Sequence, residues 1–147
     1  MTVKKKGSTQ PGADQKRARE RCAELRTALL TLHKTLVDSE RVTYEATVGK
    51  IQSSNHFLQL LTTDPWFAWL QPLSQLIVVI DEAMDAKKPL KTRDVDALEK
   101  QISVLLVPSE ESEGFGRHYF DALQRDPDVV LAHAAVGKLR KSWKAGS

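Results

Sequence analysis

The chain has 147 residues, of which 41% are hydrophobic and 28% are charged, and it contains one cysteine. This length fits one domain with a substantial core, and a single cysteine excludes a fold held by internal disulfides. The amino terminus has lysines but no apolar segment after them, so it does not resemble a secretory signal, and no apolar run reaches the ~20 residues of a membrane span. We expect a cytoplasmic protein without a membrane span.

The net charge of +3 is unevenly distributed along the chain. Residues 1–26 carry eight basic and three acidic side chains, and residues 137–147 carry four basic side chains and no acidic one. The stretch between them is therefore net acidic. Basic ends on an acidic body could attract nucleic acid or anionic lipid, pair with a second copy, or keep the protein in solution.

The first part of the chain is predicted to be a tail followed by amphipathic helix. Residues 1–13 are rich in Lys, Gly, Ser and Pro and predict a disordered basic tail, and residues 14–147 predict a helical domain. We favour a break near residues 38–42 that divides residues 14–62 into two helices, and one long helix is the alternative. Leucines at spacings of four, three and four mark the apolar stripe: Leu25, Leu29, Leu32 and Leu36.

Residues 64–84 form the most apolar segment. Asp64 followed by Pro65 is a helix start, because the Asp side chain can accept from a free amide and Pro needs no hydrogen bond at the first position. Pro72 predicts a bend or a short preceding turn. Apolar residues cover nearly every face of this segment, so we expect it to lie at the centre of the fold.

Two more helices are predicted between residues 92 and 125. Thr92 is expected to cap the first, which ends before Pro108, and Ser109 to open the second, whose first turns contain Gly114 and Gly116.

The last helix is predicted from a second Asp-Pro pair, Asp126 and Pro127. Its apolar residues recur at spacings of three and four and form a narrow seam that ends in Val136, Leu139 and Trp143. Together these patterns predict an all-α, single-domain bundle of five or six helices around a central apolar helix. Buried strands over residues 76–80 and 102–107 are the rival interpretation.

The acidic residues Asp81, Glu82 and Asp85 are candidate metal ligands. They are three and four positions apart, so on a helix Asp85 can share a face with either of the others and bind a hard cation such as Mg²⁺. A divalent-metal-dependent hydrolase is therefore one alternative function. The competing interpretation is a solvated acidic helix end.

Four histidines fall on four different predicted helices: His33, His56, His118 and His133. The Glu-x-x-His pattern of metal sites in helical bundles is absent, so hydrogen-bonded, partly buried histidines are favoured at positions 33 and 133. Cys22 has basic neighbours that could lower its pKa, but nothing near it in the sequence completes a catalytic dyad. We predict no cofactor and regard an enzyme as the less favoured class.

The leading functional interpretation is a non-enzymatic protein–protein interaction module that self-associates as a homodimer or binds a partner protein. Its candidate interaction residues are Leu25, Leu29, Leu32, Leu36, Val136, Leu139 and Trp143. The second alternative is weakly specific, salt-dependent nucleic-acid binding through the basic termini. Its candidate residues are Lys4, Lys5, Lys6, Arg17, Arg21, Lys138, Arg140 and Lys141.

Overall fold

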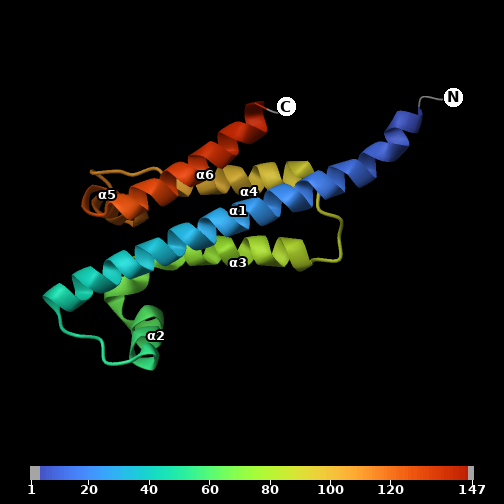
Figure 1. The fold of residues 1–147 in the computed structure, drawn as a ribbon. Coiled ribbons are helices and arrows are strands. Elements are labelled where there is room, and N and C mark those ends of the chain that lie inside the picture. The colour runs from blue at the N-terminus through green and yellow to red at the C-terminus, as the bar shows by residue number, and fades with distance from the viewer. Residues whose placement is uncertain (1–3, 146–147) are drawn as a thin grey trace.

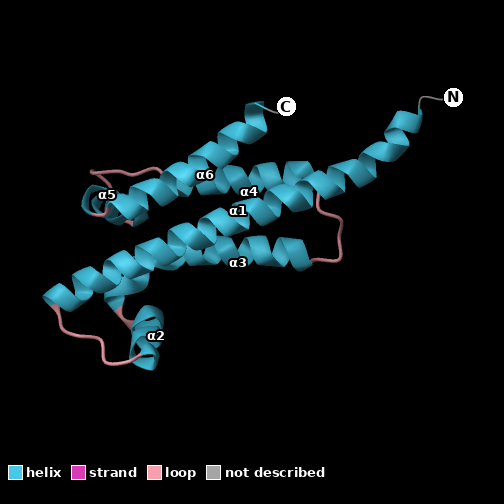
Figure 2. Cartoon of the chain, viewed as in Figure 1, coloured by secondary structure: helices cyan, strands magenta, loops and turns pink. Residues whose placement is uncertain are grey.

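The computed structural model describes the backbone of residues 4–145 and the side chains of residues 12–144. This part of the chain is helical and contains no strand, as Figures 1 and 2 show. The prediction of an all-α bundle is confirmed, and the strand alternative is wrong. The elements are α1 (Lys4–Thr47), α2 (Ser54–Thr63), the 3₁₀ helix η1 (Pro65–Leu70), α3 (Gln71–Asp85), α4 (Thr92–Leu105), α5 (Phe115–Arg125) and α6 (Pro127–Ala145).

The helix at the centre of the fold is α1. It runs the length of the molecule, with α3, α4 and α6 along it and α2 and α5 at the end where it finishes (Figure 1). The expectation that residues 64–84 form the central helix is wrong, because Val78 and Val79 on α3 are 51% and 40% exposed. The leucine stripe of α1 is instead completely buried and forms the middle of one continuous core.

Residues 14–62 form two helices, but the predicted position of the break is wrong. Residues 38–42 continue α1, because Ser39 and Glu40 are buried and both accept hydrogen bonds from the Arg125 guanidinium of α5, at 3.3 and 2.7 Å. With no Gly or Pro in this stretch, buried polar partners keep the backbone helical. The chain leaves the helix only after Thr47, where Gly49 adopts a φ of 157° that favours glycine.

The apolar segment begins as predicted. The Asp64 carboxylate accepts from the Trp66 amide at 2.8 Å, and a short 3₁₀ helix precedes α3. Pro72 lies in the first turn of α3, where a backbone donor is not needed. The expected turn before Pro72 is therefore confirmed.

The starts of α4 and α5 differ from the prediction. Lys91 is the residue that precedes α4, and its amide donates to the Asp94 carboxylate at 3.0 Å. The Thr92 hydroxyl donates instead to Asp14 of α1 at 2.7 Å. Ser109 does not open a helix, because its amide pairs with the Gly116 carbonyl at 3.0 Å across the loop that precedes α5.

Aspartate side chains fix the starts of α6 and α4. Asp126 starts α6 as predicted, since its carboxylate accepts from the Asp128 amide at 2.9 Å. The α1 helix begins at Lys4, and Asp14, within α1, accepts hydrogen bonds from Thr92 at the start of α4. Residues 1–3 lie outside the described part of the chain, and a disordered tail over residues 1–13 stays a prediction.

Candidate interaction surface

A groove of about 630 Å³ lies between α3 and α4 on the surface of the bundle. Six of its nine lining residues are apolar, and Lys100 is the only charged one. We call this feature the α3/α4 groove. Its lining residues are Pro72, Gln75, Leu76 and Val79 from α3, and Ala97, Lys100, Gln101, Val104 and Leu105 from α4.

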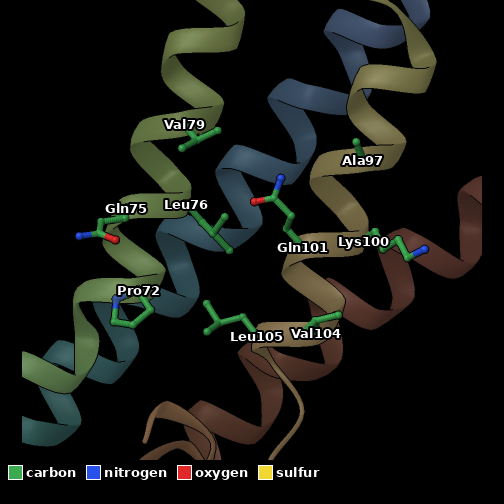
Figure 3. A pocket seen from close by; sticks show the side chains of 9 residues that line it. All are labelled: Pro72, Gln75, Leu76, Val79, Ala97, Lys100, Gln101, Val104 and Leu105. Atoms are coloured by element: carbon green, nitrogen blue, oxygen red, sulfur yellow. The ribbon is translucent and has the colours of Figure 1, made fainter.

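The side chains of the groove fall into an inner and an outer set. Leu76 and Val79 project from α3 toward α4, and Gln101 and Leu105 project from α4 toward α3, with α1 behind them (Figure 3). Lys100 points away from the gap. The inner set is thus three apolar side chains and one uncharged amide.

Apolar residues on the walls of the groove are unusually accessible. Val104 is 71% exposed and Val79 is 40% exposed, and Val107, in the loop that follows α4, is 58% exposed. The opposite sides of the same helices are buried against the core, through residues such as Leu73 on α3 and Leu98 on α4. Both helices therefore have two apolar faces, of which the fold covers one. Exposed apolar surface of this kind is typical of interaction sites.

A second hollow, of about 570 Å³, lies between α1 and α6. Three carboxylates line it, from Asp38, Asp126 and Asp128, beside the exposed Leu131. Charged residues are depleted from the centres of protein interfaces, so this hollow is less suited to apolar docking than the α3/α4 groove.

The sequence-predicted interaction residues lie elsewhere. The leucines of the α1 stripe and Val136 are buried in the core, so they do not present an interaction face. Leu139 and Trp143 are half-buried, and Trp143 lies beneath the Arg21 guanidinium and donates to Glu24 at 3.3 Å. A helical stripe cannot by itself distinguish an internal contact from an external one. Burial corrects the prediction for the α1 leucines and Val136, and Leu139 and Trp143 stay predicted interaction residues.

The sequence does not point to the α3 wall of the groove, because its pattern places residues 64–84 wholly in the core. On α4, a signal is present in the sequence: Ala97 and Val104 lie off the stripe formed by Val95, Leu98 and Ile102. Apolar residues outside the buried stripe of an amphipathic helix indicate a second contact face.

The three acidic residues proposed as metal ligands, Asp81, Glu82 and Asp85, do not share the same surroundings. Asp81 forms an ion pair with Arg26 of α1, and Glu82 and Asp85 are exposed at the end of α3. Among the described residues, no group of three His, Cys, Asp or Glu is arranged to hold a metal ion. The geometry therefore gives the hydrolase alternative no support.

Two histidines are partly buried and hydrogen-bonded as expected. His33 Nε2 lies 2.7 Å from the Ser74 hydroxyl, and His133 Nδ1 lies 2.6 Å from the Tyr119 hydroxyl. Burial lowers the pKa of both imidazoles, and Arg140 adds to the effect at His133. Both side chains therefore serve the packing of helices, in their neutral form.

Cys22 is completely buried in α1. Burial raises the pKa of its thiol, and this outweighs the nearby charge of Arg19. The basic neighbours thus do not produce a thiolate.

The residues that the sequence suggests for nucleic-acid binding differ in their exposure and in the contacts they make. Arg17, Lys138 and Lys141 are exposed, whereas Arg21 covers Trp143 and Arg140 forms an ion pair with Glu99. The side chains of Lys4, Lys5 and Lys6 lie outside the described part of the chain.

Comparison with known protein families, with curated proteins and with solved structures found no match. Within the described residues, none of the helices combines the length and the apolar character required to cross a bilayer.

Proposed function

We propose that the chain is a non-enzymatic helical interaction module of the cytoplasm, and that it self-associates by placing the α3/α4 grooves of two copies against each other. The observation that carries this proposal is the accessible apolar surface of Val79 on the α3 wall and Val104 on the α4 wall. Covering these side chains removes apolar surface from water, which is the main driving force of most protein association.

The arrangement of the two helices suits a second copy. A six-residue connection, residues 86–91, joins α3 to α4, and the two helices run in opposite directions (Figure 1). Helices of 15 and 14 residues are about 22 and 21 Å long. Two such antiparallel pairs can pack as a four-helix layer related by a twofold axis, which closes the assembly at two copies.

The charges around the groove also favour this arrangement. Lys100 points away from the gap, so two copies can meet without bringing like charges into the apolar centre. The Gln101 amide points inward, and it can both donate and accept hydrogen bonds. In a dimer, the Gln101 amide of each copy can form hydrogen bonds with the Gln101 amide of the other.

The test is sedimentation equilibrium on a groove variant and a matched control. Val79→Lys/Val104→Lys places two charges on the groove, on side chains that are 40% and 71% exposed. Val130→Lys/Leu131→Lys adds the same charge on α6, at side chains 44% and 69% exposed. We expect the groove variant to be monomeric and the control to associate like the unmodified chain, with thermal melts showing that both fold.

Equal effects of the two variants would contradict the proposal, because the added charge would then act without regard to its position. Loss of association in the α6 variant alone would also contradict it and would favour the hollow between α1 and α6.

A further inference from the structure

The described parts of the two basic termini lie at the same end of the molecule, together with the loop between α3 and α4 (Figure 1). Trp143 of α6 donates to Glu24 of α1, and the Arg19 guanidinium of α1 donates to the Met84 carbonyl at the end of α3. Asp14 accepts from Thr92 at the start of α4. These contacts fix three segments of the chain beside one another. We call their surface the basic end and define it as residues 12–26, 81–100 and 138–144.

The charges of the molecule are separated between its two ends. The basic end has fourteen basic and nine acidic side chains, whereas residues 27–80 and 101–137 have five basic and ten acidic ones. The sequence pointed only to the termini as basic. The structure adds Lys87, Lys88, Lys91 and Arg93 of the α3–α4 connection and the first turn of α4, within residues 81–100, which carry five basic and six acidic side chains in all.

Most of these cations are available to a ligand. Within the described part of the chain, Arg26 and Arg140 are the basic side chains of this end that form ion pairs. The lysines of the three segments are exposed: Lys16, Lys87, Lys88, Lys91, Lys100, Lys138, Lys141 and Lys144.

The chemistry of the basic end favours nucleic acid over a membrane surface. Peripheral membrane binding combines basic residues with apolar side chains that enter the lipid. Among the described residues, the exposed large apolar side chains all lie outside the basic end. Lysines and arginines without an apolar wedge suit the phosphate backbone, which binds by charge and releases counterions.

We propose that the basic end binds the phosphate backbone of nucleic acid without sequence preference. The loop lysines Lys87 and Lys88 contribute to this surface together with Lys138 and Lys141. This inference is independent of self-association, since the α3/α4 groove and the basic end share only Ala97 and Lys100 among the residues that line the groove.

The experiment measures fluorescence anisotropy of a labelled duplex DNA of ~20 base pairs and mixed sequence, titrated with the full chain from ~50 to ~200 mM salt. The test variant is Lys87→Glu/Lys88→Glu, in an exposed loop where charge reversal leaves the helices intact. The control is Lys34→Glu/Lys50→Glu, two exposed lysines outside the basic end, with the same change in net charge.

We expect the loop variant to bind about tenfold more weakly than the unmodified chain and to lose about two units from the slope of log K against log salt. The control should change affinity less than about threefold, because its cations lie outside the surface. Equal weakening by both variants would overturn the proposal, as would the absence of DNA binding at ~50 mM salt. Tighter binding to vesicles containing phosphatidylserine than to DNA would overturn it in favour of a lipid surface.

Discussion

The Tyr119 hydroxyl of α5 lies 2.6 Å from Nδ1 of His133 on α6. Burial raises the pKa of Tyr119, so the phenol keeps its proton and is the donor, while the lowered pKa of His133 leaves Nδ1 free to accept. The Tyr119 ring also stacks on Phe115 at a centroid distance of 5.3 Å. The Tyr119 hydroxyl and ring, with a ring centroid 5.4 Å from that of His133, thus pack α5 against α6, whereas the contact with Phe115 lies within α5.

Removing this hydroxyl tests its contribution to stability. Tyr119→Phe should lower the free energy of unfolding by about 1–2 kcal/mol, because a half-buried imidazole nitrogen loses its donor. The measurement is urea denaturation followed by circular dichroism. Tyr44→Phe is the matched control, since Tyr44 is also buried among aromatic rings and has no hydroxyl hydrogen bond among the described contacts. A cost as large for Tyr44→Phe would show that the hydrogen bond is not responsible.

The stability of the fold should decrease as the pH falls from 7 to 5. The folded state holds His33 and His133 with lowered pKa values, so the unfolded chain, in which histidine titrates near 6.5, binds more protons as the solution becomes acidic. Unfolding is therefore favoured below about pH 6.5. The free energy of unfolding measured at pH 7 and pH 5 should differ less in His33→Gln/His133→Gln. An unchanged difference in that variant would assign the effect to other groups.

A second loss of stability is expected at lower pH. A hydrogen bond from the Thr92 hydroxyl lowers the pKa of Asp14. At Glu99, burial alone would raise the pKa, but hydrogen bonds from Ser103 and Arg140 outweigh it and the net shift is downward. Carboxylates of this kind stabilise the fold above their unfolded pKa and lose that effect as they are protonated. Thr92→Val should reduce the part of the acid transition that lies below about pH 4.

The buried leucine stripe provides a stability test with an adjacent control. Leu29 is completely buried, whereas its neighbour Leu30 is 38% exposed. Leu29→Ala should lower the free energy of unfolding by about 2–5 kcal/mol, because it leaves a cavity in the core. Leu30→Ala should cost less than about 1 kcal/mol. Chemical denaturation of both variants measures the difference, and equal costs would contradict the assignment of the stripe to the core.

The sequence predicted the elements of the fold better than their mutual positions. Local signals were sufficient where a cap is made by residues close in the chain, as at Asp64 and Asp126. The continuation of α1 through residues 38–42 depends instead on Arg125, 85 residues away from Glu40. The partner of Thr92 is likewise 78 residues away. Such long-range contacts decide where a helix continues and which residue caps it. They leave no periodic pattern in the sequence.

The candidate site was harder to predict than the fold. The α1 stripe and the walls of the α3/α4 groove have the same residue types at helical spacing, and only the packing of α1 under α3, α4 and α6 decides which stripe is covered. The basic end shows a related limit. Its two terminal segments are visible in the sequence as charge runs, but their position beside the end of α3 and the start of α4 depends on long-range contacts such as Arg19 with Met84 and Asp14 with Thr92.

The most direct test of self-association through the α3/α4 groove is the mass of the full chain in solution, measured by light scattering over a dilution series at ~0.1 and ~0.5 M salt. We predict a dimer of about 33 kDa, twice the 16.5 kDa of one chain, at both salt concentrations, because association by apolar burial is not weakened by screening. A mass that stays at 16.5 kDa at every concentration would contradict this account.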